Sequence, residues 1–235
     1  MQKIIFICFI FFPVCIFANS RCNNLLPKIS LQIKDAYTIE DQLKLYSNYY
    51  DICKSNENYN YNYGLLFYNN NDFQQAKLYI ENAINLKKEA SYFYLLGLVE
   101  FELKNSELAR KNFKLALQEN KAFFQASLGL AKLLLDDNNI NEAIVVLEKA
   151  SEISTNTELS LTLAKLYYKT FNYINAKKIL HGLLSENRNI LTEVLKILVL
   201  IEYNQKNYEE LNTLYDLYPY FFIENKEFRR FVQRE

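Results

Sequence analysis

The sequence predicts an all-α protein in which antiparallel helix pairs stack into a solenoid that ends in a C-terminal capping helix. Two observations carry this prediction: glycine and proline are scarce, and one apolar pattern recurs along the chain. The 235 residues include only 4 Gly and 3 Pro. An all-β chain of this length needs many tight turns, which normally use more of both residues. Helices joined by short polar turns fit the composition better.

The recurring pattern has a period of 33 to 35 residues. Ala83, Ala116 and Ala150 lie 33 and 34 positions apart, and Leu183 and Tyr218 continue the series after a further 33 and 35. Two more apolar residues precede each of these, seven and three positions earlier: Ala76 and Ile80, Ala109 and Phe113, Ala143 and Leu147, Ala176 and Leu180, and Leu211 and Tyr215. Such i, i+4, i+7 spacing is typical of the buried stripe of an amphipathic helix.

A second helical segment precedes each stripe, and a polar turn joins the two. We predict these first helices at residues 59–69, 91–103, 124–135, 159–169 and 191–203. The turns are rich in Asn and Asp, for example at 69–72 and 136–139. Asn and Asp tolerate left-handed backbone and cap the helix that follows. Each pair is therefore expected to be a helix–turn–helix hairpin.

Over roughly residues 57–218, these features resemble the tetratricopeptide repeat family. Three copies are in good register, namely Gly64 to Ala83, Gly97 to Ala116 and Ala131 to Ala150. Two weaker copies end at Leu183 and Tyr218, and no copy has the family's usual tryptophan or terminal proline. The resemblance implies a right-handed solenoid of about five repeats that binds proteins and is not an enzyme. A Sel1-like repeat or an irregular helical bundle remains an alternative.

The resemblance also implies a concave face lined by the first helix of each repeat. We predict eight partner-binding residues on it: Tyr61, Tyr68, Tyr94, Phe101, Lys132, Lys165, Tyr168 and Tyr203. Tyrosine suits a binding face because it offers a large contact area at low entropic cost and a hydroxyl group. We expect the face to hold an extended or helical protein segment with an apolar stretch and an acidic end. Alternatively, some of these tyrosines pack between neighbouring first helices.

Residues 1–20 are predicted to be an export signal. Lys3 is followed by an uncharged apolar run at 4–18, which is shorter than the roughly 20 residues of a transmembrane helix but suits a secretory signal. Ala18 and Ser20 favour cleavage before Arg21, with cleavage after Ala18 as the alternative. We expect a periplasmic or secreted protein without a membrane span after cleavage. The competing interpretation is an uncleaved membrane anchor.

Two further segments flank the repeats. Residues 21–56 are predicted to be an N-terminal arm with a capping helix at 40–54, and residues 219–235 a C-terminal capping helix. Removal of the signal would leave only Cys22 and Cys53, for which we predict a disulfide, with two unpaired thiols as the alternative. The capping prediction rests on Phe221, Phe222, Phe228 and Phe231, which alternate with charged residues.

Composition excludes several functions. The 27 basic and 27 acidic residues balance, so no strongly basic field favours a nucleic-acid partner. Two cysteines and the single His181 fall short of a structural zinc set, and no motif indicates a cofactor or catalysis. The sequence therefore predicts an exported scaffold or adaptor that binds a protein or peptide. The alternatives are a structural or self-associating module and a non-catalytic accessory subunit of a separate enzyme.

Overall fold

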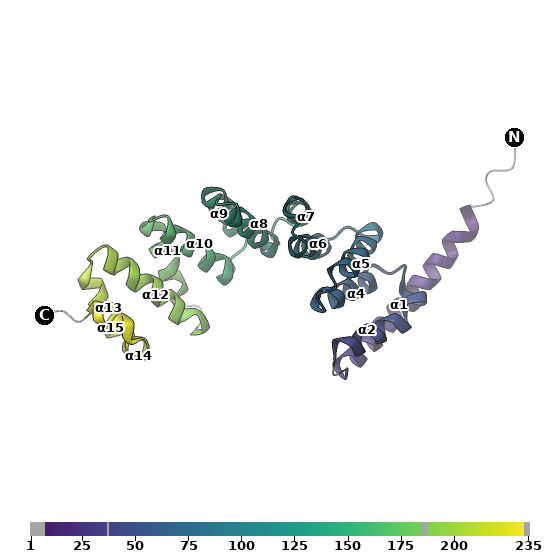
Figure 1. Cartoon of the computed structure of the whole chain (residues 1–235), viewed down its shortest axis with the longest axis horizontal. Helices are drawn as coiled ribbons and strands as arrows, with labels where there is room; N and C mark the ends of the chain where they lie inside the picture. The colour runs from purple at the N-terminus through teal and green to yellow at the C-terminus, as the bar shows by residue number, and fades with distance from the viewer. Residues whose placement is uncertain (1–7, 37, 185–187, 233–235) are drawn as a thin grey trace. The chain divides into compact units, whose positions relative to one another are not determined.

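The computed structural model describes residues 8–36, 38–184 and 188–232, without the side chains of residues 8–19, 188 and 189. Within these ranges every regular element is an α-helix, and the helices pack in consecutive pairs, which confirms the predicted fold class (Figure 1). The chain divides into two compact units, Met1–Leu133 (unit 1) and Leu134–Glu235 (unit 2). No helix in the described ranges combines the length and apolar character needed to cross a membrane.

Unit 1 contains the N-terminal arm and the first two repeats. Its helices are α1 (Cys8–Lys34), α2 (Ile39–Asn48), α3 (Tyr50–Cys53), α4 (Glu57–Asn69), α5 (Phe73–Leu86), α6 (Ala90–Glu102), α7 (Ser106–Glu119) and most of α8 (Phe124–Asp136). The pairs α4–α5 and α6–α7 form hairpins, and α5 also packs on α6. The arm is more regular than its sequence indicated, since α1 reaches Lys34 and packs on α2 and α3.

Unit 2 contains the remaining repeats and the C-terminal cap. After the end of α8 come α9 (Ile140–Ile153), α10 (Thr157–Lys169), α11 (Tyr173–Leu183), α12 (Arg188–Asn204), α13 (Tyr208–Leu217), α14 (Pro219–Glu224) and α15 (Lys226–Val232). The single capping helix predicted at 219–235 is thus two short helices over the described residues. Asn225 interrupts them because its backbone is not helical and its side-chain amide donates to the Phe221 carbonyl at 2.9 Å.

The small residues of the predicted stripes lie where helices approach one another. Ala76, Ala109, Ala143 and Ala176 are all fully buried. Glycines in the first helices serve the same end. A Cβ on Gly97 would lie 2.6 Å from the Phe113 ring, and one on Gly129 would lie 2.8 Å from it. Phe113 of α7 therefore fills space that only glycine leaves open on α6 and α8.

Each of the five turns within the hairpins contains one residue with left-handed backbone. These residues are Asn71, Lys104, Asn138, Phe171 and Lys206, with φ between 57° and 64°. The next residue caps the second helix, and its N–H bonds a carbonyl five residues earlier, as Asp72 does to Phe67 at 2.9 Å. Left-handed backbone was expected for asparagine, but the structure also imposes it on two lysines and a phenylalanine.

Replacing Phe171 by glycine is expected to raise the free energy of unfolding by about 1 kcal/mol, because a side chain other than glycine is strained in this conformation. The ring is 76% exposed, so little packing is lost. Urea unfolding of the glycine and alanine variants measures the effect. Phe171→Ala removes the same ring but keeps the strained Cβ, and it should show no gain. Equal stabilities of the two variants would contradict the assigned strain.

Two buried carboxylates join neighbouring repeats by the same arrangement. Glu100 of α6 lies 2.7 Å from the ammonium nitrogen of Lys77 on α5, and it accepts a hydrogen bond from Asn105 at 2.7 Å. In unit 2, Glu202 of α12 lies 3.0 Å from Lys177 on α11 and accepts from Asn207 at 2.8 Å. In each case the lysine follows a stripe alanine of the preceding repeat, and the asparagine caps the next helix.

A cluster of tyrosine rings forms the core between α2, α4 and α5. The Tyr46, Tyr59 and Tyr63 rings lie within 5.1 to 5.8 Å of one another, and Tyr79 lies 4.4 Å from Tyr63. The Tyr59 hydroxyl donates to the Tyr46 carbonyl. Burial raises the pKa of Tyr46 and of Tyr63 to about 12, and it also raises the pKa of Tyr59.

Alkaline pH is expected to unfold unit 1. In the unfolded chain these tyrosines lose their protons near pH 10, whereas in the folded chain Tyr46 and Tyr63 hold them to about pH 12. Stability is therefore complete below pH 10 and falls as the pH rises towards 12. Helical circular dichroism and tyrosinate absorbance should change together in one titration. Ionisation of all the tyrosines near pH 10 with the helices retained would contradict the burial.

Candidate functional site

The first helices of unit 1 share a face that is neither fully buried nor fully polar. We call it the first-helix face, and it consists of Tyr61, Leu65 and Tyr68 on α4, Tyr94, Leu98 and Phe101 on α6, and Leu128 and Lys132 on α8. On each helix the members are three or four positions apart, which places them on one stripe. The apolar members are half-buried, whereas Lys132 is exposed. The face thus offers apolar surface to solvent.

Two lysine side chains lie beside the ring of Phe101 on this face. The ammonium nitrogen of Lys132 lies 4.4 Å from the centre of the Phe101 ring, and that of Lys104 lies 5.8 Å from it. Both contacts are cation–π interactions, worth about 0.5–1 kcal/mol each at exposed sites. They hold two positive charges beside an aromatic ring, where a carboxylate of a bound molecule can pair with them.

The tyrosines predicted for unit 1 fall into two groups. Tyr61 stacks on Tyr92 at 4.8 Å, and Tyr94 contacts the rings of Phe113 and Phe123 at 5.8 and 5.4 Å. These two tyrosines help to pack the repeats together. Tyr68 contacts Phe73 at 5.7 Å, and its pKa is raised by burial and, to a lesser extent, by Glu102. Tyr68 thus contacts a ring of its own hairpin, whereas Tyr61 and Tyr94 contact rings beyond their own hairpins.

A pocket that the sequence did not reveal adjoins this face. The arm pocket, as we call it, has a volume of about 490 Å³ and is lined by Asn23, Leu26, Pro27, Ser30 and Ile33 of α1, Tyr46 of α2, and Asn62, Leu65 and Leu66 of α4. Leu65 belongs to both, so the pocket is continuous with the first-helix face. The arm appeared irregular in sequence, although the spacing of Leu26, Ile29 and Ile33 was an available helical signal.

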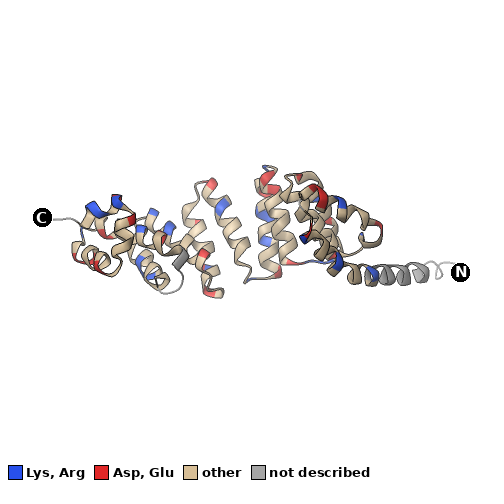
Figure 2. Cartoon of the chain, turned by 90° about the horizontal axis from the view of Figure 1, so that it is seen from below, with Lys and Arg blue, Asp and Glu red and all other residues tan. Residues whose placement is uncertain are grey.

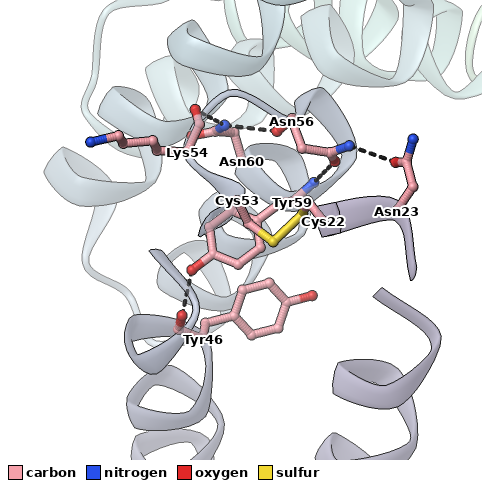
Figure 3. The surroundings of a disulfide bond; sticks show 8 residues. All are labelled: Cys22, Asn23, Tyr46, Cys53, Lys54, Asn56, Tyr59 and Asn60. Atoms are coloured by element: carbon pink, nitrogen blue, oxygen red, sulfur yellow. Dashed lines mark hydrogen bonds between the residues drawn. A yellow bond between two sulfur atoms is a disulfide. The ribbon is translucent and has the colours of Figure 1, made fainter. Parts of the chain in front are cut away.

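The α1 wall of the pocket is held by the Cys22–Cys53 disulfide, which joins α1 to α3 (Figure 3). Both cysteines are fully buried. Polar contacts accompany the bond: the Asn56 side chain donates to Asn23 on α1 at 2.8 Å and accepts from the Tyr59 N–H at 2.9 Å. One covalent bond to α3 and one hydrogen bond from the N-cap residue of α4 thus fix the middle of α1.

In unit 2, the predicted partner-binding residues are engaged within the chain. Lys165 forms an ion pair with Glu193 at 2.7 Å, and Tyr168 lies 6.1 Å from the ring of Tyr173. Tyr203 is 42% exposed and stacks on Phe231 of α15 at 4.2 Å. The C-terminal helix therefore covers part of the surface that the sequence had assigned to a partner.

Unit 2 also has a pocket of about 480 Å³ between α9, α10 and α11. Its walls include Glu148, Glu152 and Lys178, and the Tyr167 hydroxyl donates to Glu148. Burial, followed by this hydrogen bond, raises the pKa of Tyr167 to about 12. Across the described ranges, no group of three His, Cys, Asp or Glu side chains is arranged to hold a metal ion.

Comparison with known proteins identifies the repeats. The tetratricopeptide repeat family model matches residues 57–89 and 90–123, which are the α4–α5 and α6–α7 hairpins. Residues 57–123 thus match the family that the sequence resembles. Repeats of this family build extended surfaces for protein interaction and are generally non-catalytic. No curated protein sequence matches the chain.

Solved structures with the same fold cover most of the chain. The chain is similar to Pseudomonas aeruginosa PilF with a TM-score of 0.65 and 16% identity, over 91% of this chain and 98% of that one. A tetratricopeptide repeat protein from Parabacteroides merdae gives 0.60 and 17%, over 83% and 78%. YrrB, described as having an unusual peptide-binding site, gives 0.53 and 17%, over 76% and 90%. At these identities the similarity shows the fold alone.

Proposed function

We propose that this protein is an exported adaptor that holds a segment of a partner protein against the first-helix face of unit 1. The observation that carries the proposal is the half-buried apolar stripe of that face, with Lys104 and Lys132 beside Phe101. A segment with an apolar stretch and an acidic end complements this face in apolar character and in charge. Lys and Arg are otherwise interspersed with Asp and Glu on the helices of both units, which favours a protein partner over a nucleic acid (Figure 2).

We assign no catalytic step to the chain. His181 is exposed on α11. The buried carboxylates have structural partners, because Glu100 and Glu202 are each neutralised by a lysine and bonded by an asparagine of the repeats. Such groups hold the helices of neighbouring repeats together.

Export is supported by the disulfide, because disulfides form and persist mainly in oxidising compartments. Cleavage before Arg21 would leave the whole α1 wall of the arm pocket, from Asn23 to Ile33, in the mature chain. The test is mass spectrometry of the protein isolated from cell envelope and medium. We expect an N-terminus at Arg21 and a Cys22–Cys53 bond. A retained N-terminus with two free thiols in the cytoplasm would contradict export.

The adaptor role is tested by capture from an envelope extract. The parent chain is compared with a Tyr68→Ala and Phe101→Ala variant, after both are shown to have equal helical content. The proposal expects a partner that the parent holds and the variant loses. A control variant, Leu78→Ala and Leu108→Ala, alters exposed leucines on the second helices and should retain the partner. Identical capture by all three proteins would mean that the first-helix face is not the site.

The stack of Phe231 on Tyr203 favours a second candidate function. In it the protein is a structural or self-associating module, and its own residues cover predicted partner-binding residues such as Tyr203. Sedimentation over a range of concentrations separates the two functions. Association that increases with concentration and is lost in the Tyr68→Ala and Phe101→Ala variant would favour the self-associating module. A monomer at all concentrations favours the adaptor.

A further inference from the structure

The uncharged lining of the arm pocket limits which side chains can enter it. Its nine lining residues include five apolar side chains and four with neutral polar groups, Asn23, Ser30, Tyr46 and Asn62, but no charged side chain. A charged group placed there would lose its hydration without gaining an opposite charge, which is costly. A neutral apolar side chain loses nothing of this kind, and its flanking peptide groups can form hydrogen bonds with the carboxamides and the Ser30 hydroxyl.

The position of the pocket connects it with the proposed partner segment. Leu65 lies both in the pocket wall and on the first-helix face, one helical turn from Tyr61 and from Tyr68. A segment lying along α4 therefore passes the pocket mouth. The volume, about 490 Å³, lies within the range of ligand pockets, so it accommodates side chains rather than a folded domain.

One wall of the pocket depends on the disulfide. Five of the nine lining residues belong to α1, which is joined covalently to the rest of unit 1 through Cys22 and Cys53. Ile29, Leu26 and Ile33 add apolar contacts with the same core cluster. Without the bond, α1 is held by these contacts and by two side-chain hydrogen bonds, from Asn56 to Asn23 at 2.8 Å and from the Tyr49 hydroxyl to Gln32 at 3.2 Å. The wall then separates from α4 at a lower cost in free energy.

We propose that the arm pocket receives a large apolar side chain of the partner segment, and that the Cys22–Cys53 disulfide keeps the pocket in its binding form by holding α1 in place. The inference rests on the proposed function, because it assigns an anchor point to the segment bound on the first-helix face. It makes the N-terminal arm part of the binding site, and it makes binding dependent on oxidation of the two cysteines.

The test uses short random peptides displayed on phage and selected on the oxidised, exported chain. The most enriched peptide is labelled with fluorescein and titrated by anisotropy. We expect it to contain a large apolar residue within an uncharged stretch. Ser30→Arg places a charged side chain in the pocket from an exposed position and should weaken binding about tenfold or more. Asn24→Arg adds the same side chain to α1 outside the pocket lining and should leave the affinity unchanged.

The disulfide is tested in the same titration. Cys22→Ala/Cys53→Ala should weaken binding about tenfold while circular dichroism shows that the repeat helices remain folded. Parental affinity in this variant would overturn the role of the disulfide. Equal affinities of Ser30→Arg and Asn24→Arg would overturn the pocket as the anchor site. The pocket inference would also be overturned if the chain self-associates, Ser30→Arg abolishes the association and the peptide does not inhibit it. The occupant of the pocket would then be a second copy of the chain.

A further variant separates this inference from the proposed function. If Tyr68→Ala/Phe101→Ala weakens peptide binding and Ser30→Arg does not, the adaptor function stands and the pocket inference is wrong. If neither variant weakens binding, both are wrong. Loss of affinity in both, with Asn24→Arg unaffected, supports the two proposals together.

Discussion

Replacing Lys177 by methionine is expected to lower the free energy of unfolding of unit 2 by about 3–5 kcal/mol, the cost of leaving a buried charge without its partner. Glu202 is fully buried, and Lys177 approaches its Oε1 atom to 3.0 Å. This oxygen accepts no hydrogen bond from the described residues, so the lysine charge is its main compensation. Asn207 satisfies only the other oxygen, at 2.8 Å. Urea unfolding followed by circular dichroism measures the loss.

The neighbouring lysine provides the matched control. Lys178 is exposed, and Lys178→Met should change the stability by no more than about 0.5 kcal/mol. Adding Glu202→Gln to Lys177→Met should restore much of the loss, because the buried charge is then removed with its partner. Equal losses in the two lysine variants, or no recovery in the double variant, would contradict the assigned ion pair.

Removing the disulfide with Cys22→Ala/Cys53→Ala is expected to destabilise unit 1 by about 3–4 kcal/mol. The cysteines are 31 positions apart, and closing a loop of this length restricts the unfolded chain by that amount in the chain-entropy model. The measurement compares the urea midpoints of parent and variant with and without reductant. Reductant should lower the midpoint of the parent to that of the variant.

Two further results bear on the same bond. Since both sulfurs are fully buried, reduction in the folded state requires local opening, and it should accelerate as urea approaches the midpoint. Reductant should not affect the double variant. A parent midpoint that is the same with and without reductant would show that the bond does not contribute to the stability of unit 1.

The repeats were predictable because their signals are local. The apolar stripes show the helix period and the repeat length within a few dozen residues. The first residue of each stripe is buried as expected, at Ala76, Ala109, Ala143, Ala176 and Leu211. The polar turns were also found from sequence, because asparagine marks the caps. The strain at Phe171 was not foreseen, since nothing in its residue type indicates left-handed backbone.

The candidate site was only partly predictable, because its parts come from distant segments. The resemblance to the tetratricopeptide repeat family placed Tyr68 and Phe101 on one face, but it did not show which tyrosines pack internally. The arm pocket combines α1 with α4, and no local pattern reports that contact. The buried pair of Lys177 and Glu202 likewise depends on the packing of α11 against α12. The cover of Phe231 on Tyr203 depends on how the last helices fold back.

The most direct test of the account is a titration that compares the two sides of unit 1. The enriched peptide is titrated against the parent, against Tyr68→Ala/Phe101→Ala, and against Leu78→Ala/Leu108→Ala, which removes comparable apolar surface from the second helices. The account predicts about a tenfold or greater loss of affinity for the first variant and no change for the second. Loss in the second variant with full binding by the first would contradict it, because the partner would then lie on the opposite side of the repeats.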